Sequence, residues 1–483
     1  MSAETKTLLD LIKATQDQTT AEARKAQAAK VAEEVKSLGV IKTFNDGQLV
    51  KHLTTLLENK KQAPLREAAY MILTSVSKAV GQAGEPYLIP LVPKVLDGYA
   101  DKVIPVRDAA EEASKAIMAL PSRYAVKLLL PVLFDSIENG RWQSQCGSLQ
   151  LLAGLSKTSP KQISLCLSDI VPVLSASMWS TRPEVRTEAT KTTTACFEVV
   201  GNPDLNSSIP YLVGCINRPE EAPECIHQLA STTFVTTVEA PTLAIMNPLL
   251  IRGLAERSPA IQRQTAVIID NMCKLVENPA HAHQFLPKLL PGLDRMIEIG
   301  ASPELRSVAE RARATLVRVG GGEKAQEEST INIAYEVKPA EVFETLKKTI
   351  GSGLKVDDFV KTSLNYSATL CSELITSRDF EADAWDASIY PYLVTFVSKD
   401  EAKRVASDVH KFYVDFDAKN ALNNAAVADV EEGELLCDCE FSLAYGGMIL
   451  LNKTRLNLRR GQRYGLCGPN GVGKSTLMRA IAD

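Results

Sequence analysis

The stretch Val106-Arg107-Asp108-Ala109-Ala110 decides the fold, because the same kind of sequence returns along the first two thirds of the chain. The other clear copies are Val185-Arg186-Thr187-Glu188-Ala189, Ile261-Gln262-Arg263-Gln264-Thr265-Ala266 and Leu305-Arg306-Ser307-Val308-Ala309. Two copies follow a serine and a proline, at Ser258-Pro259 and Ser302-Pro303. A hydroxyl N-cap and a first-turn proline, which has no amide hydrogen to leave unpaired, are typical of helix starts. Each copy therefore predicts the beginning of an alanine-rich helix.

A second repeated element places a proline among apolar residues and occurs six times. Successive prolines are 38, 41, 38, 38 and 43 residues apart. The copies are Leu91-Val92-Pro93, Leu129-Leu130-Pro131, Ile170-Val171-Pro172, Ser208-Ile209-Pro210, Met246-Asn247-Pro248 and Leu289-Leu290-Pro291. We expect each proline to lie inside a helix, where it removes one backbone hydrogen bond and bends the helix.

The two elements alternate, so each repeat is predicted to be a hairpin of two helices. Such a hairpin cannot bury its apolar stripe alone, and consecutive copies are expected to stack into a solenoid. The period, the proline in the first helix and the Val-Arg start of the second resemble the HEAT repeat. Six copies are clear and a seventh runs from Gln48 to Ala69. Residues 1–320 are therefore predicted to form a HEAT-repeat α-solenoid of about seven repeats, with an extended surface for a large partner, protein or RNA.

Composition narrows the class of protein. With 45% hydrophobic and 23% charged residues among 483, the chain can bury a sizeable core. The formal charge of 54 minus 58, or −4, excludes a surface that is wholly a nucleic-acid or anionic-membrane footprint. The densest apolar run, at 126–134, contains Lys127 and Pro131 and is far shorter than the roughly 20 residues that span a bilayer. No signal-peptide pattern is visible, so we expect a soluble, cytoplasmic protein without a membrane partner.

Arginines near the end of the array have two interpretations. They could form a ridge that faces RNA, or a solvated helix face on which acidic residues alternate with them. The residues are Arg306, Arg311, Arg313 and Arg318, with Glu304 and Glu310 among them.

The cysteines and histidines favour structural over metal-binding roles. Isolated cysteines in apolar surroundings predict a buried, reduced core; they are Cys146, Cys166, Cys196, Cys215, Cys225, Cys273 and Cys371. Cys437 and Cys439 would share one face of a strand with Phe441, which favours core packing over zinc. His281 and His283 are expected at a loop or helix end.

Composition shifts divide the rest of the chain. We expect a linker at 321–338, after Gly320-Gly321-Gly322, and a small helical bundle at 339–420, where apolar residues recur at a spacing of three and four. An acidic segment at 421–434 predicts a second linker. Residues 435–483 are predicted to begin a nucleotide-binding domain, with strands at 440–445, 448–451, 455–458 and 463–467.

The chain carries one motif with specific chemistry, Gly468-Pro469-Asn470-Gly471-Val472-Gly473-Lys474-Ser475-Thr476. It fits the Walker A phosphate-binding loop, whose glycines allow successive amide hydrogens to converge on phosphates at a helix N-terminus. Lys474 would reach the β and γ phosphates of ATP, Ser475 would bind Mg²⁺ through its hydroxyl, and Thr476 lies beside it. A strand before the motif and an amphipathic helix after it support the interpretation.

The motif and the preceding Leu456, Leu458 and Gly461 resemble the nucleotide-binding domain of ATP-binding-cassette proteins. Those proteins stack an aromatic residue on adenine from a loop a little over twenty residues upstream. The resemblance implies that role for Tyr445, which lies 23 positions before Gly468; a tyrosine of the core or of a turn is the alternative.

HEAT repeats, a bundle and a cassette in one chain together resemble the fungal translation elongation factor 3 family. The resemblance is closest at 265–277 and at 437–482. It implies an ATPase that uses ATP and Mg²⁺ on the ribosome, promoting release of deacylated tRNA from the exit site and delivery of aminoacyl-tRNA. It further implies that the HEAT array contacts ribosomal RNA and proteins, with tRNA and another elongation factor as further partners.

The chain departs from that family after the phosphate-binding loop. It has no Walker B aspartate with its catalytic glutamate, no signature motif and no second cassette, and no catalytic residue is assigned in it. We therefore expect an N-terminal part, truncated after Walker A and inactive alone. The alternative function is a HEAT-repeat ribosome-binding scaffold or regulator with a vestigial phosphate-binding loop and no ATPase activity.

Overall fold

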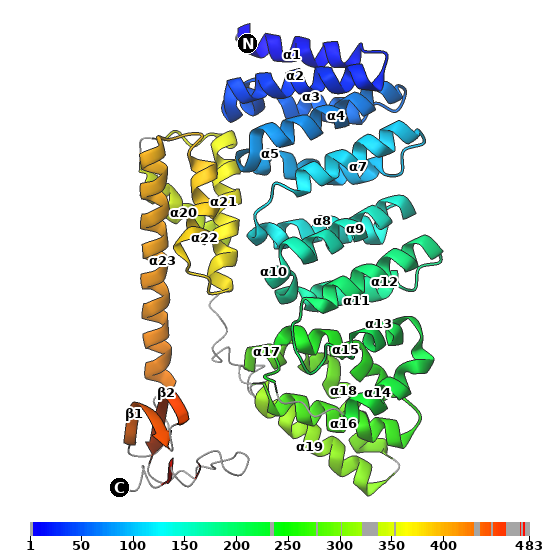
Figure 1. The fold of residues 1–483 in the computed structure, drawn as a ribbon, viewed down its shortest axis with the longest axis vertical. Helices are drawn as coiled ribbons and strands as arrows, with labels where there is room; N and C mark the ends of the chain where they lie inside the picture. The colour runs from blue at the N-terminus through cyan, green and yellow to red at the C-terminus, as the bar shows by residue number, and fades with distance from the viewer. Residues whose placement is uncertain are drawn as a thin grey trace. The chain divides into compact units, whose positions relative to one another are not determined.

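The chain folds into a long array of paired helices, a helical bundle and a strand hairpin (Figure 1). The computed structural model describes residues 3–231, 236–276, 279–300, 302–320, 337–351, 354–428, 435–445 and 448–459, with residues 474, 477 and 478. These residues belong to two units, Met1–Val414 and Asp415–Asp483. The fold is mainly α, as the sequence predicts.

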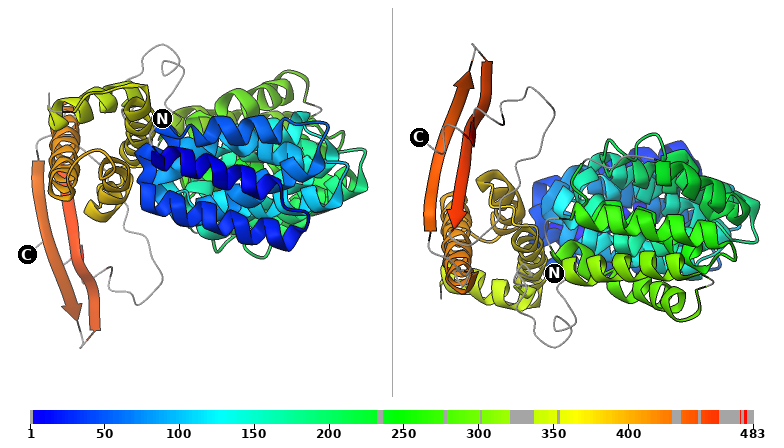
Figure 2. Two further views of the ribbon diagram at one scale, coloured as in Figure 1. Left: turned by 90° about the horizontal axis from the view of Figure 1, so that it is seen from above. Right: turned by 90° about the horizontal axis from the view of Figure 1, so that it is seen from below.

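The array comprises the helices up to residue 319, and the longer ones that can be followed in Figure 2 share roughly one direction. Their bounds are α1 (Ala3–Gln16), α2 (Ala21–Val40), α3 (Leu49–Leu57), α4 (Ala63–Val80), α5 (Glu85–Leu88), α6 (Val92–Gly98), α7 (Ile104–Met118), α8 (Val126–Asn139), α9 (Trp142–Thr158), α10 (Pro160–Leu165), α11 (Leu167–Ser177), α12 (Pro183–Glu198), α13 (Ile209–Asn217), α14 (Ala222–Ser231), α15 (Ala240–Ala255), α16 (Pro259–Lys274), α17 (Pro279–His283), α18 (Leu286–Ile299) and α19 (Pro303–Val319).

Helices of the same kind pack on one another through the array. Second helices meet second helices, as in α2 with α4, α4 with α7, and α16 with α19. First helices meet first helices, as in α8 with α11, α11 with α15, and α15 with α18. The result is two layers with the apolar residues between them, which is how stacked hairpins bury a stripe that one hairpin leaves exposed.

In the copies of the Val-Arg element that contain it, the arginine after the apolar residue has a common structural role. Its guanidinium donates to a backbone carbonyl six or seven residues earlier, in the turn between the two helices of the repeat. The pairs are Arg66 with Asn59 (2.7 Å), Arg107 with Asp101 (2.9 Å), Arg186 with Ser180 (2.8 Å) and Arg306 with Gly300 (3.1 Å). In the copy that lacks arginine, the amide of Gln262 donates to the carbonyl of Glu256 at 2.7 Å.

The first helix pair carries the same contact, although no repeat element is recognisable before Gln48 in the sequence. Arg24 Nη1 in α2 donates to the carbonyl of Gln18 at 2.9 Å, and its Nη2 pairs with Glu67 of α4 at 2.9 Å. Neither α1 nor α2 contains proline, which is why the sequence pattern missed this pair.

The repeated prolines occupy two different positions. Pro131, Pro172, Pro248 and Pro291 lie inside α8, α11, α15 and α18, as predicted. The prediction is wrong for Pro93 and Pro210, which lie in the first turns of α6 and α13. A proline there leaves no hydrogen bond unmade, because first-turn amides have no helical acceptor.

The two predicted serine caps also differ. The Ser302 hydroxyl accepts from the amide of Leu305 at 3.2 Å. Ser258 precedes α16 in the N-cap position but makes no such hydrogen bond.

Four helices form the bundle: α20 (Pro339–Ile350), α21 (Asp358–Thr376), α22 (Ala382–Leu393) and α23 (Lys399–Ala428). Helix α23 continues eight residues into the segment 421–434 that we expected to be a linker. That segment begins with alanine and asparagine, and alanine has the highest helix propensity of any residue. The expected linker at 321–338 lies outside the described residues, apart from its last two.

The bundle packs on the N-terminal part of the array within the first unit. The carboxylate of Glu85, at the start of α5, is fully buried and accepts from the hydroxyls of Tyr366 (2.8 Å) and Tyr392 (2.9 Å). Beside it, the rings of Phe44, Tyr87 and Phe359 form a stack. The sequence predicts the bundle at 339–420 but gives no sign that it contacts the array through Glu85.

Within the described residues, no single helix is long and apolar enough to cross a membrane. One pair, Ile104–Met118 with Arg123–Asn139, meets the length and composition test together but is bent by 111°.

Replacing Arg66 tests the guanidinium contact. Arg66 also forms a bidentate ion pair with Asp101, at 2.8 and 3.0 Å, and both side chains are only 13% exposed. We expect Arg66→Met to lower the free energy of unfolding by about 2–4 kcal/mol, because it leaves a carbonyl and a carboxylate unpaired. Denaturant unfolding followed by circular dichroism measures this. Lys61→Met, at an exposed position in the same turn, is the control and should change the value by less than about 0.5 kcal/mol.

Replacing Glu85 tests the contact between bundle and array. Burial raises the pKa of Glu85 from 4.5 to about 7, against the opposing effect of the two tyrosine hydrogen bonds. The folded protein therefore binds this proton more tightly than the unfolded chain. The corresponding stability is complete below pH 4.5 and is lost as the pH rises to 7, a change of about 3 kcal/mol.

In Glu85→Gln the side chain stays neutral and can still accept from both tyrosines. Its stability should therefore lack this fall between pH 4.5 and 7, which parallel denaturation of both proteins would show. Equal pH profiles for the two proteins would contradict the assignment.

Candidate nucleotide-binding site

The strands that precede the phosphate-binding motif form a hairpin in the second unit. Strands β1 (Leu435–Tyr445) and β2 (Met448–Arg459) pair antiparallel, with Cys437 opposite Leu458 and Tyr445 opposite Met448. The predicted strands at 448–451 and 455–458 are one continuous strand, so their separation was wrong. The break was placed at polar residues 452–454, but polar side chains are compatible with a strand whose two faces differ in exposure. The expected strand at 463–467 lies outside the described residues.

Tyr445, the residue predicted to stack on adenine, is the last residue of β1. It therefore stands at the end of the strand. Its role toward a nucleotide stays a prediction.

Lys474 is the one residue of the phosphate-binding motif that the structure describes. Its backbone is helical, as is that of Leu477 and Met478, and its side chain is half-buried. Helical backbone at this point is what the motif requires of its lysine, since the phosphates would lie at the helix N-terminus. The roles of the other motif residues toward ATP stay predictions, because they lie outside the described residues; they are Gly468, Pro469, Asn470, Gly471, Val472, Gly473, Ser475 and Thr476.

The cysteines and histidines behave largely as predicted. Every predicted core cysteine has a free thiol and is buried, except Cys146, which is half-buried. His283 ends α17, as expected, and its Nδ1 lies 3.0 Å from the carbonyl oxygen of Gly320. Within the described part of the chain, no cluster of three or more histidine, cysteine, aspartate or glutamate residues is arranged to bind a metal.

Most of the arginines at the end of the array pair with other groups of the protein. Arg311 pairs with Asp270 at 3.0 Å, and Arg313 pairs with Asp294 at 2.6 Å. Arg306 makes the turn contact described above. Among the interleaved acids, Glu304 pairs with Arg263 at 3.0 Å. These pairs favour the interpretation of a structural, partly solvated face over a ridge that faces RNA.

Asp270 is the centre of this network. Its buried carboxylate accepts from Thr315 (2.7 Å), Lys274 (2.8 Å) and Arg311 (3.0 Å), which connects α16 to α19. Burial alone would raise the pKa of Asp270. Hydrogen bonds from Lys274 and Thr315, with the charges of Lys274 and Arg311, outweigh burial and lower that pKa below its ordinary value.

Sequence reasoning missed two other features, Glu85 and an apolar cavity that contains Trp179 and Arg252. Glu85 lies two residues before the apolar run Tyr87-Leu88-Ile89, but an acid beside an apolar run does not by itself identify a buried carboxylate. No local signal marks the cavity, because its residues come from three separate helices.

Four family models match successive parts of the chain. They are described as "EF3 N-terminal HEAT repeat" at residues 24–193, "Elongation factor 3/GNC1 HEAT repeat" at 221–327, "Four helical bundle domain" at 339–412 and "ABC transporter" at 451–483. Their order is that of the array, the bundle and the start of a cassette.

Curated relatives named Elongation factor 3 match nearly the whole chain. The protein of Phytophthora infestans is 41% identical over 99% of this chain and 45% of its own length. Those of Pneumocystis carinii and Candida albicans are 43% and 40% identical, over 87% and 92% of this chain and 40% and 43% of their own lengths. The chain thus spans less than half the length of these relatives. A solved structure of a microtubule-polymerase TOG domain array matches 82% of this chain and 99% of its own chain at 10% identity, with a TM-score of 0.30.

Asp270→Asn tests whether the arginine face is structural. The substitution removes the charge that Lys274 and Arg311 share, and we expect it to lower the free energy of unfolding by about 1–3 kcal/mol at pH 7. Because the pKa of Asp270 is depressed in the folded state, its contribution is present above about pH 4 and is lost as the pH falls below that value.

The matched control is Asp294→Asn, whose carboxylate is 44% exposed in its pair with Arg313. An exposed pair contributes little, so the change should stay below about 1 kcal/mol. Equal losses in the two variants would contradict a special role for Asp270.

Proposed function

The chain belongs to the elongation factor 3 family, and we propose that the whole protein is a ribosome-associated, ATP-dependent translation elongation factor. The observation that carries the proposal is the identity of 41% to such a factor over 99% of this chain. The match to the ABC transporter model over residues 451–483 supports use of ATP.

The nucleotide site would use the residues of the phosphate-binding motif. Backbone amides of residues 468–473 would bind phosphate oxygens, Lys474 would neutralise charge on the β and γ phosphates, and Ser475 would hold Mg²⁺. Tyr445 would stack on the adenine. ATP bound with Mg²⁺ would release energy on hydrolysis, and the residues of this chain would bind and orient the nucleotide.

The array and bundle would supply the ribosomal contacts. A two-layer array exposes a long surface, and such surfaces suit large partners such as ribosomal RNA and ribosomal proteins. We further propose that the protein promotes release of deacylated tRNA from the exit site and delivery of aminoacyl-tRNA. Its further partners would be tRNA and another elongation factor. We propose a cytoplasmic location, which these partners would require.

The 483-residue chain alone is expected to have no ATPase activity. It contains no Walker B aspartate and no catalytic glutamate, so nothing in it activates the attacking water. An ATP hydrolysis assay of this chain checks the expectation.

Lys474→Ala in the whole protein tests the site. We expect ATP affinity at this cassette to fall at least about tenfold, because one charge-assisted phosphate contact contributes roughly 1.5–3 kcal/mol. Equilibrium binding of a fluorescent ATP analogue measures it, with hydrolysis in the presence of ribosomes as a second readout.

Lys403→Ala is the control, since this exposed lysine lies on α23, outside the motif. It should bind ATP like the unchanged protein. If Lys474→Ala also retains full affinity, the motif is vestigial and the protein is a scaffold.

A further inference from the structure

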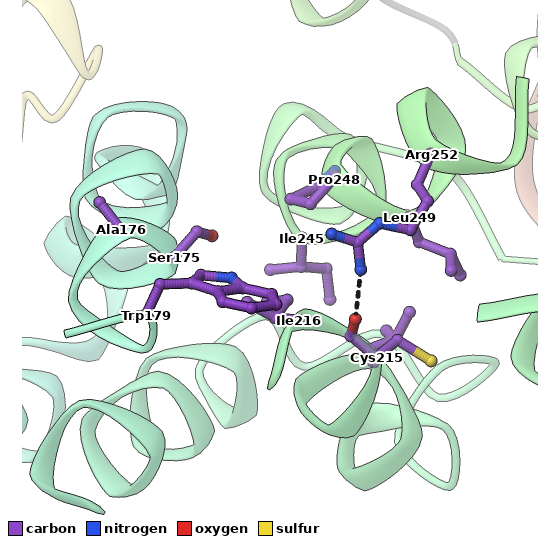
Figure 3. Close-up of a pocket in the computed structure, with 10 residues that line it drawn as sticks. Ser175, Ala176, Trp179, Cys215, Ile216, Ile245, Pro248, Leu249 and Arg252 are labelled. Carbon is purple, nitrogen blue, oxygen red and sulfur yellow. Dashed lines mark hydrogen bonds between the residues drawn. The ribbon is translucent and has the colours of Figure 1, made fainter. Parts of the chain in front are cut away.

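The array contains a cavity of about 260 Å³ where three first helices meet. Its lining comes from α11 and the residues just after it, from α13 and from α15, and includes Leu212, Ile216, Ile245 and Leu249 (Figure 3). All of these belong to the first unit. The walls are therefore mainly aliphatic, and the cavity opens on the surface of the array.

Three polar groups stand at this apolar cavity. Arg252 Nη1 donates to the carbonyl of Cys215 at 2.7 Å, which fixes the guanidinium at one side of the cavity. Trp179 stands across from it in Figure 3 and is 55% exposed, although it is among the largest apolar side chains of the protein. The hydroxyl oxygen of Ser175 is buried and has no hydrogen-bond partner among the described residues.

The charge of the lining residues favours an anionic ligand in this cavity. The lining contains one cation and no aspartate or glutamate. The fixed arginine, the indole N–H and the serine hydroxyl can all donate, so a ligand that presents a carboxylate beside an apolar group complements them.

The volume of the cavity limits the size of the group that can enter it. Sites for cofactors and drug-sized molecules usually enclose roughly 300–1,000 Å³, and this cavity is smaller. It is large enough for one bulky apolar side chain. Tryptophan and arginine are also the residues that most often dominate binding energy at protein interfaces.

We propose that this cavity binds an acidic peptide segment of a protein partner, with one leucine-sized side chain inside and a neighbouring carboxylate paired with Arg252. A nucleic acid fits less well, because phosphate binding needs a row of cations and the lining offers one. The site is separate from the nucleotide motif, so the proposal goes beyond the proposed function and does not depend on it.

The probe is a fluorescein-labelled, acetylated peptide with one leucine flanked by aspartates. Fluorescence anisotropy with the 483-residue chain should show saturable binding with a dissociation constant of about 10⁻⁴ M. Replacing the aspartates of the peptide by asparagines, or its leucine by alanine, should weaken binding at least about fivefold in each case.

Variants of the chain locate the site. Trp179→Ala should weaken binding at least about tenfold, and Arg252→Gln should abolish the preference for aspartate over asparagine peptides. Arg252→Lys retains the charge and should keep that preference. Tyr211→Ala is the matched control, because this tyrosine is 53% exposed on α13 but does not line the cavity; its affinity should be unchanged, and thermal melts confirm folding of all variants.

Several results would overturn the proposal. They are absence of saturable binding at millimolar peptide, equal binding by Trp179→Ala, or no preference for aspartate. Tighter binding of an oligoribonucleotide that Trp179→Ala abolishes would assign the cavity to RNA, and Trp179-dependent self-association in sedimentation would assign it to a second copy of the chain.

Discussion

One hydrogen bond recurs through the array. In each repeat that contains this hydrogen bond, it determines how the turn places the second helix against the first. A side chain in the first turn of the second helix, usually arginine, donates to a carbonyl in the turn before that helix. The carbonyls there have no helical donor, so the guanidinium satisfies groups that the turn leaves unpaired and fixes the path between the two helices. A fixed turn sets how each hairpin meets the next, and the buried stripe forms only if successive hairpins meet in the same way.

Two buried carboxylates add further contacts, one within the array and one between the array and the bundle, and they do so by opposite means. Asp270 is charged and surrounded by donors from its own helix and from α19, which is the condition under which a buried charge is tolerated. Glu85 has no cation as a hydrogen-bond partner among the described residues, and burial favours its neutral form between the two tyrosines of the bundle. The first contact stiffens the array, and the second places the bundle against it.

The sequence was sufficient for features that are encoded locally. The Val-Arg repeat and the proline spacing predicted the helix pairs, because both recur at the period of the structural unit. The contact of Glu85 with Tyr366 and Tyr392 was not predictable, since 281 and 307 positions separate these residues and no motif marks either end. The prediction divided β2 into two strands because residues 452–454 are polar, whereas pairing with β1 continues the strand through them. The prediction ended α23 too early because the sequence there is mixed, whereas the helix propensity of alanine continues the helix. Of the candidate site, Lys474 was placed in helical backbone as the motif requires, and Trp179 with Arg252 escaped notice because three helices create their cavity.

We propose that the array and bundle carry the affinity for the ribosome, while the nucleotide motif serves a separate step. Co-sedimentation of the 483-residue chain with purified ribosomes, with and without ATP, tests it most directly. We expect the chain to enter the ribosomal pellet to the same extent in both conditions, and we expect the amount to fall with rising salt, as contacts to ribosomal RNA require. If the chain, with its helical content intact, stays in the supernatant at low salt, the array is not the ribosome-binding part and the proposal is wrong.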